Sequence, residues 1–493
     1  MRITSFLLLL LICTISNAQK KDEHLLEFKI NGIQNDTVYL ANYYGDKLYY
    51  RDTAIADANG SFQFTEEYDG GIYAVVVPGP KYFEFLMNEP AFSMETDIVD
   101  FNKNMKIHGS KENSLFFDYI DFLATKNKEA EGYKNDVRLF DDARKTEAKD
   151  KLDKIDGEVK AYQRALIENN PGTFVSSVIN MSMDIEIPEE LKDDTSKAGI
   201  DIGYKYYLMH YWDNVDLSDD KIVRTSVFHR KLDTYFKTTI VQVSDSITAA
   251  VDRLLEHTKP NSEIRKYVVH FVTYTFETSD IMGLDAVFVH MGLNYYCPDE
   301  NGVSPAWWMT DEKIEKLCER ANKLAPLRLG QKAPYLSLPD TTEKNWVQLW
   351  SLEGPYTILY FWDPNCGHCK KETPVLLELY HSELKEKGIE VYSVGKATGD
   401  DFEDWKEYIV ENDLDWINVG LTKNVFNKAQ KNSNEFIPRY TTIGSLNYTE
   451  TYDIYSTPRV FILDQDMIIR AKGISVEQIS ELLQRFEEKK EEE

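Results

Sequence analysis

The sequence predicts a multidomain protein in which an antiparallel β-domain and an all-α domain precede a C-terminal α/β domain. The length of 493 residues exceeds the roughly 100–200 residues of a single domain. Strand-like alternation fills residues 26–109, and helical spacing dominates residues 114–324. After residue 329, strand-like and helix-like segments alternate, as they do in mixed α/β domains.

The composition is that of an ordinary globular protein, with 42% hydrophobic and 28% charged residues. The 56 basic and 83 acidic residues give a net charge of −27, which would repel a nucleic-acid backbone or an anionic membrane surface. No run of Lys and Arg interleaved with aromatic residues offsets this charge. We therefore expect no nucleic-acid partner.

Residues 1–18 have the pattern of a signal peptide. Arg2 precedes an apolar run over residues 6–15, and Ser16 and Ala18 supply the small residues before a cleavage site. This run is shorter than the about 20 residues that span a membrane, and no later stretch is long enough. We expect an exported protein of the periplasm or cell envelope that is soluble after cleavage. Lipidation of Cys13 is disfavoured because a small residue does not precede it.

Residues 19–110 are expected to form the antiparallel β-domain. Strand alternation occurs at residues 27–30, 37–40, 61–64, 72–77 and 83–87. The segment D-A-N-G at residues 57–60 predicts a hairpin turn.

Residues 111–326 are expected to form the helical domain. Ile155, Val159 and Leu166 recur at helical spacing, and the Pro-Gly pair at residues 171–172 should end one helix before the next begins.

Residues 327–487 alternate between strand and helix patterns. Strands are expected at residues 356–362, 389–394, 416–419, 460–463 and 468–472, and helices at residues 366–387, 402–411 and from 479 onward. The charged tail, residues 488–493, is expected to be solvated.

A C-x-x-C motif carries the clearest chemical signal. Cys366 and Cys369, separated by Gly367 and His368, lie where a buried strand is expected to turn into a helix. A helix N-terminus stabilises a thiolate, the form that attacks disulfides. Cys366 is therefore the expected nucleophile and Cys369 the resolving thiol of a redox disulfide. A protonated His368 would favour the thiolate further.

Two other cysteines, Cys297 and Cys318, are 21 residues apart in no such motif. They could form a structural disulfide in an exported compartment or remain two free thiols, and the sequence leaves both alternatives open. Their spacing does not complete a zinc site with the C-x-x-C pair. We expect no metal and no organic cofactor.

The C-terminal residues resemble the thioredoxin superfamily, in particular the TlpA/ResA-like exported thiol-disulfide oxidoreductases. The resemblance rests on Trp362 before the active turn, on the C-G-H-C motif with the following Lys370-Lys371-Glu372-x-Pro374, and on Thr457-Pro458 before an apolar strand. It implies a thioredoxin fold. The order of domains also resembles multidomain envelope thioredoxin-like proteins, whose leading domains have no known role.

The resemblance assigns further roles to these residues. Thr457 and a cis Pro458 would lie against the dithiol and bind the substrate chain, and Glu372 would manage its protons. Tyr360 stands where thioredoxin has a buried aspartate, so that proton path is in doubt. Trp362, Gly367 and His368 would support the active turn, with a Gly-His dipeptide resembling that of protein disulfide isomerases.

The expected function is that of a periplasmic thiol-disulfide oxidoreductase acting on disulfides or dithiols of envelope proteins, most readily as a reductase fed by a membrane electron donor. Cytochrome c maturation is one role that the resemblance implies. The alternative is an envelope binding or scaffold protein in which the dithiol is a regulatory latch. A peroxidase is disfavoured because Asp363 occupies the threonine position of the P-x-x-x-T-x-x-C motif.

Overall fold

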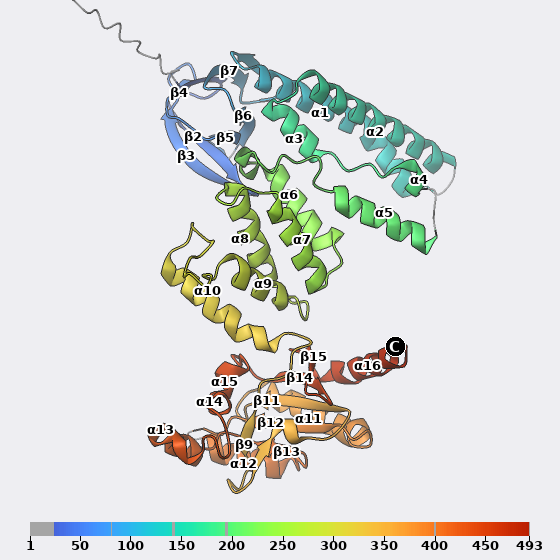
Figure 1. Ribbon diagram of the computed structural model, residues 1–493. Helices are drawn as coiled ribbons and strands as arrows, with labels where there is room; N and C mark the ends of the chain where they lie inside the picture. The colour runs from blue at the N-terminus through green and yellow to red at the C-terminus, as the bar shows by residue number, and fades with distance from the viewer. Residues whose placement is uncertain (1–23, 80, 141–142, 193–195, 399–400, 493) are drawn as a thin grey trace, which may run out of the picture. The chain divides into compact units, whose positions relative to one another are not determined.

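The computed structural model describes residues 24–492 apart from residues 80, 141–142, 193–195 and 399–400. The expected signal peptide lies outside the described residues. The chain divides into two compact units, residues 1–235 and 236–493, and each is described by itself. The predicted succession of β-sheets, helices and a C-terminal mixed α/β domain is confirmed (Figure 1).

Two sheets begin the first unit. The strands of one sheet are, in spatial order, β4 (Ser61–Phe64), β1 (Leu25–Asn31), β7 (Ala91–Asp97) and β8 (Lys106–His108). The strands of the other are β3 (Lys47–Ile55), β2 (Thr37–Tyr44), β5 (Gly71–Val77) and β6 (Lys81–Met87). Phe28 lies between them, with ring centroids 5.4 Å from Phe62 in its own sheet and 5.5 Å from Phe85 in the other. The two sheets thus share one core.

Two expectations about this β-domain were wrong in detail. β1 pairs with β7 in parallel, so the domain is not purely antiparallel. The D-A-N-G turn follows β3, but β3 and β4 belong to different sheets, so the turn is not a hairpin. The Asp57 carboxylate holds it by accepting from the backbone N–H groups of Asn59 and Ser61. Local pattern predicted the turn correctly but could not predict which strands would pair.

Helices complete the first unit. They are α1 (Lys111–Leu139), α2 (Ala143–Asn169), α3 (Phe174–Ser182), α4 (Glu189–Lys192), α5 (Lys197–His210) and α6 (Ser226–Thr234), with the short η1 (Asp220–Arg224) before α6. α1 and α2 pack along each other (Figure 1). The Asn113 side chain docks α1 onto the edge strand β6, because it bonds both the backbone N–H and the carbonyl of Leu86, at 2.7 and 2.9 Å.

The second unit begins with further helices. They are η2 (Tyr235–Thr239), which spans the division between the units, then α7 (Ser244–Glu256), α8 (Glu263–Glu277), α9 (Asp285–Tyr295), α10 (Asp311–Leu324) and η3 (Ala325–Leu327). The buried Lys472 of the C-terminal domain contacts Asp285 at the start of α9, and donates to the Leu327 carbonyl at 2.7 Å. Ion pairing inside the unit therefore joins these helices to the domain that follows.

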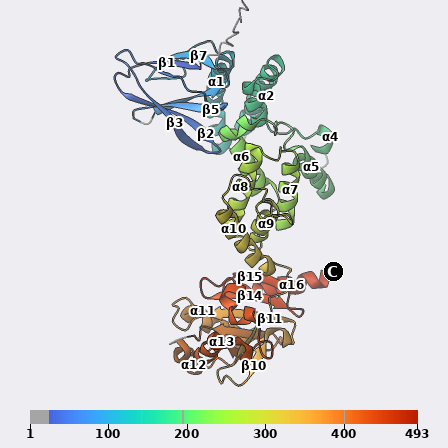
Figure 2. The ribbon, with the colours of Figure 1, turned by 60° about the vertical axis from the view of Figure 1, so that its left-hand side comes forward.

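The C-terminal domain is built on one central sheet, which Figure 2 shows from a second direction. Its strands are, in spatial order, β13 (Ile417–Val419), β12 (Glu390–Gly395), β11 (Tyr356–Trp362), β14 (Arg459–Asp464) and β15 (Ile469–Lys472), with a separate hairpin of β9 (Ser337–Pro339) and β10 (Trp346–Gln348). β12 is parallel to β11, and β14 is antiparallel to it. This is the mixed α/β architecture that the alternation predicted.

Helices cover both faces of this sheet. They are α11 (Cys369–Leu379), α12 (Asp401–Glu411), α13 (Lys423–Lys431), α14 (Ile443–Leu446), α15 (Tyr448–Thr451) and α16 (Ile479–Glu492), with short turns η4 (Leu349–Ser351), η5 (Tyr380–Leu384), η6 (Ser433–Glu435) and η7 (Val476–Gln478). Along β11, Tyr360 and Trp362 face the core under α11, whereas Leu359 and Phe361 face the core on the opposite side. Burial on both faces explains why β11 is a continuous apolar run.

Two helix boundaries differ from expectation. α11 begins at Cys369 rather than at Cys366, and regular α-helix ends at Leu379. α16 continues through Glu492, so residues 488–492 of the expected tail are helical, and the side chains of residues 488–490 are exposed. A charge run that continues an amphipathic helix can extend that helix although it buries nothing.

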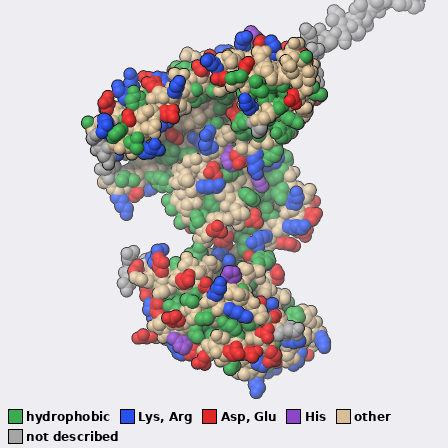
Figure 3. Space-filling model, turned by 180° about the vertical axis from the view of Figure 1, so that it is seen from behind, with side chains coloured by type: hydrophobic (Ala, Val, Ile, Leu, Met, Phe, Trp, Pro, Cys, Tyr) green, Lys and Arg blue, Asp and Glu red, His purple; other side chains and the backbone are tan. Residues whose placement is uncertain are grey.

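The surface carries mixed charge. Figure 3 shows acidic and basic side chains interspersed over the face that it presents. Among the described residues, no helix combines the length and the apolar character needed to cross a membrane.

We predict that Gly395→Ala destabilises the C-terminal domain by about 1–3 kcal/mol, as overpacking does. A Cβ at residue 395 would lie 1.9 Å from Nε1 of Trp405, whose side chain is fully buried. Gly444→Ala is the control, because its Cβ would meet Thr451 at 3.4 Å, an ordinary contact. The urea midpoint of tryptophan fluorescence should fall for the first variant only. Equal midpoints would contradict this packing.

Candidate active site

The cysteine pair lies in the turn between β11 and α11. The Cys366 N–H donates to the Asp363 carbonyl at 3.1 Å, and the Asn365 N–H donates to the Asp363 carboxylate at 2.7 Å. These bonds close a turn, which is why the helix starts three residues later than expected. The Cys366 carbonyl nevertheless accepts from the Lys370 N–H at 3.1 Å. Cys366 therefore lies at the N-terminus of α11, beside the first N–H groups of the helix.

The two thiols have different surroundings. Cys366 is partly exposed, whereas Cys369 is 1% exposed. Sγ of Cys366 accepts from the Cys369 N–H at 3.4 Å and donates to the Thr457 carbonyl at 3.2 Å. An incoming disulfide can thus reach Cys366, while Cys369 is accessible only to a sulfur already joined to Cys366.

The thiol pKa values diverge accordingly. Burial raises the pKa of Cys366, but hydrogen bonds from the Cys369 backbone and thiol, from the Thr457 side chain and from the His368 backbone outweigh it, so the pKa lies below its ordinary 9.0. Burial raises the pKa of Cys369 to about 12. The exposed sulfur is the one with thiolate character, as a nucleophile requires.

Sheet register brings Thr457 to the dithiol. The Thr457–Pro458 peptide bond is cis, and β14 begins at the next residue, Arg459, which pairs with Phe361 of β11. Since β11 leads directly into the active turn, antiparallel pairing places the loop before β14 beside Cys366. A second peptide bond, Ile437–Pro438, is also cis, and no sequence motif predicts it.

The expected supporting residues occupy distinct places. Trp362 is 1% exposed, and its indole N–H donates to the Ser393 hydroxyl at 2.7 Å. Gly367 and His368 are exposed in the turn, and a Cβ at Gly367 would meet nothing within 4 Å. The two residues between the cysteines are therefore exposed to solvent.

Glu372 lies in the first turn of α11, and its carboxylate accepts from the Val476 N–H of η7 at 3.1 Å. This bond ties α11 to the start of the C-terminal helical segment. The proton-transfer role expected for Glu372 stays a prediction.

Sequence reasoning missed a buried hydroxyl pair behind Cys369. The Tyr360 hydroxyl lies 2.8 Å from the Thr373 hydroxyl, and both side chains are buried. Burial, and the nearby Cys369, raise the pKa of Tyr360. Thr373 follows Cys369 by four residues, a helical spacing that places both on one face of α11. The spacing could have identified Thr373 as a neighbour of Cys369, but not Tyr360 as its partner.

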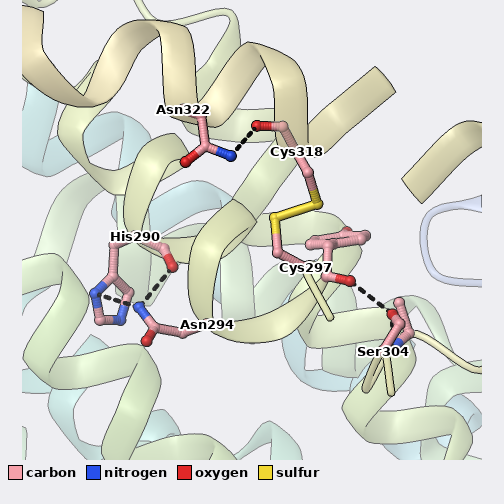
Figure 4. Close-up of a disulfide and its surroundings, with 8 residues drawn as sticks. His290, Asn294, Cys297, Ser304, Cys318 and Asn322 are labelled. Atoms are coloured by element: carbon pink, nitrogen blue, oxygen red, sulfur yellow. Dashed lines mark hydrogen bonds between the residues drawn. A yellow bond between two sulfur atoms is a disulfide. The ribbon is translucent and has the colours of Figure 1, made fainter. Parts of the chain in front are cut away.

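A disulfide joins Cys297 to Cys318, with Cα atoms 5.6 Å apart. The separation is within the about 7 Å that a bridge requires. Figure 4 shows it linking α10 to the segment that follows α9. Of the two alternatives that the sequence left open, the structure contains the bridge, which involves neither Cys366 nor Cys369.

No cluster of three or more metal-ligating side chains occurs in the described part of the chain. The dithiol chemistry needs no such cluster, because the two sulfurs and their hydrogen bonds supply the reacting groups.

Three family models match the chain. Residues 329–472 match the AhpC/TSA family. Residues 25–116 and 141–322 match two domains of unknown function, DUF4369 and DUF5106. The leading residues therefore match two families whose role is unknown.

Named relatives resemble the C-terminal domain. The thiol-disulfide oxidoreductase ResA of Bacillus thuringiensis is 35% identical over 68 residues, which are 14% of this chain and 38% of the relative. The protein of the same name from Bacillus cereus is 27% identical over 168 residues, 34% of this chain and 82% of the relative. The chain thus spans well under half of the first relative's length.

A solved structure is also similar. It is a domain of a possible thiol-disulfide isomerase from Cytophaga hutchinsonii, 34% identical, with a TM-score of 0.28, covering 34% of this chain and 99% of that chain.

We predict that iodoacetamide modifies Cys366 before Cys369 in the reduced full chain, with a half-maximal rate of Cys366 modification below pH 9. The lowered pKa leaves more thiolate at any pH beneath 9.0, whereas Cys369 stays protonated until about 12. Peptide mass mapping across pH 5–10 measures this, with Cys366→Ser as the control. Modification of Cys369 first, or a midpoint at or above pH 9, would contradict the assignment.

Proposed function

We propose that this chain, whose residues 329–472 belong to the AhpC/TSA family, is a thiol-disulfide oxidoreductase that acts on other proteins. The observation that carries the proposal is the asymmetry of the dithiol. An exposed Cys366 with a lowered pKa lies beside a buried Cys369 with a raised one. An inert structural bridge needs no such difference between its two sulfurs.

The first step is attack by Cys366. Its thiolate displaces one sulfur of a client disulfide, which forms a Cys366–client mixed disulfide and releases a client thiolate. In the free protein Sγ of Cys366 bonds the Thr457 carbonyl at 3.2 Å. A client chain lying along Thr457 would therefore present its sulfur next to Cys366.

The second step is resolution by Cys369. Once deprotonated, its sulfur attacks Cys366, the Cys366–Cys369 disulfide forms, and the second client thiolate leaves. Two electrons pass to the client, and the Cys369 proton can pass to a departing client thiolate. The raised pKa of Cys369 protects the mixed disulfide from premature resolution, because only a thiolate attacks.

The proposed location and partners of the protein rest on the export signal that the sequence predicts. An N-terminal export signal would place the dithiol in the periplasm or cell envelope, where disulfides persist. The clients would be disulfide- or dithiol-bearing envelope proteins, including cytochromes c under maturation. Acting as a reductase there requires a membrane electron donor to return Cys366 and Cys369 to the thiol state.

We predict that Cys366→Ala reduces the rate of insulin disulfide reduction to the uncatalysed level, because it removes the attacking sulfur. Cys369→Ala should instead accumulate a mixed disulfide with insulin, visible on a non-reducing gel. The double variant Cys297→Ser/Cys318→Ser is the control and should still reduce insulin. Wild-type turnover in either active-site variant would refute the proposal.

A further inference from the structure

A cavity of about 450 Å³ lies beside the dithiol. Asp363 of the active turn and Thr457 of the cis-proline loop both line it, so it is continuous with the place where a client must bind. Its volume lies within the range of about 300–1,000 Å³ typical of ligand pockets. Nothing in the thiol exchange itself uses it.

The floor of the cavity is apolar and fixed. Phe361, Val394, Leu421 and Tyr448 line it, and each is less than 10% exposed. The ring of Tyr448 stacks on that of Phe361, with centroids 5.9 Å apart. A side chain that reaches this floor would contact buried apolar groups, so burial of apolar surface against them is favourable.

The segment between β13 and the cis-proline builds most of the cavity. Ten of its sixteen lining residues come from residues 421–457, which include α13, α14 and α15. The thioredoxin-like sheet supplies the dithiol, and this helical segment supplies the wall next to it.

The charged side chains that line the cavity limit the kind of ligand that it can bind. Lys396 is the one Lys or Arg among the described lining residues. It already pairs with Asp363 at 3.2 Å and with Asp401 at 3.1 Å. An anionic low-molecular-weight thiol would find Lys396 already paired with two carboxylates, whereas an apolar side chain needs no polar partner there.

Side chains of α10 hold Tyr455, which lies at the rim of the cavity. Tyr455 is 72% exposed, yet its hydroxyl accepts from Lys323 Nζ at 2.9 Å, and that ammonium lies 4.7 Å from the ring centroid. Arg320 lies over the same ring at 5.7 Å. Both cations also pair with Asp453, each at 3.3 Å. An exposed ring is thus ordered beside the cavity.

We propose that this cavity receives an uncharged apolar side chain of the client polypeptide, from a residue next to the client cysteine. In this proposal Lys323 is a positioning residue, which holds Tyr455 at the rim of the cavity. The inference rests on the proposed function. It gives the helix α10, which the disulfide at Cys318 fixes, a part in client selection.

The test uses disulfide-linked dimers of a short peptide with Leu, Phe or Asp beside its cysteine, and hydroxyethyl disulfide as a substrate too small to fill the cavity. The reduced full chain, regenerated with dithiothreitol, should show kcat/KM about tenfold or more higher for the Leu and Phe peptides than for the Asp peptide, as apolar pockets discriminate. The difference should appear in KM.

Variants of Tyr455 and Lys323 test whether the rim causes the preference for apolar peptides. Tyr455→Ala and Lys323→Met should bring the Leu-to-Asp ratio toward one, while Lys323→Arg retains it. Lys316→Met is the matched control, because Lys316 lies on α10 but is 71% exposed and pairs with Glu312; its ratio should equal that of the wild type.

Turnover of hydroxyethyl disulfide without a preference for apolar peptides would overturn this inference and leave the proposed function intact. An unchanged ratio in Tyr455→Ala would overturn it as well. Failure to turn over any of these disulfides would refute the proposed function itself, and the inference with it.

Discussion

The antiparallel pairing of β11 with β14 is the constraint on which the candidate site depends. Cys366 and Thr457 are 91 residues apart, and no local preference could bring them together. Register does so, because Phe361 near the end of β11 pairs with Arg459 at the start of β14. The active turn and the cis-proline loop therefore meet where β11 ends and β14 begins, at one end of these two interior strands. β11 is buried along its whole length, which fixes that end.

Burial then separates the roles of the two sulfurs. Desolvation acts on both thiols and raises both pKa values, but only Cys366 receives enough hydrogen bonds at the mouth of α11 to reverse the effect. A shift of one pKa unit corresponds to about 1.4 kcal/mol, so modest differences in bonding decide which sulfur attacks.

The sequence predicted the local features and missed the long-range ones. Short patterns predicted the active turn, the strand β11 and the cis-proline loop. They are the C-G-H-C motif, the apolar run of β11 and the Thr457-Pro458 pair. The strand β3 was missed because most of its residues are exposed and lack an apolar face. The parallel pairing of β1 with β7 joins residues 66 positions apart. The contact of Lys323 with Tyr455 joins residues 132 positions apart. Spacing carries no information on such pairs.

The reduction potential of the Cys366–Cys369 couple in the full chain tests the account most directly. Equilibration with graded thiol buffers, read by quantitative alkylation, should give a reversible two-electron transition. The account of a reductase predicts a midpoint near that of thioredoxin, about −270 mV. A midpoint near that of DsbA, about −120 mV, would contradict the reductase, and the lack of any reversible transition would contradict the redox couple.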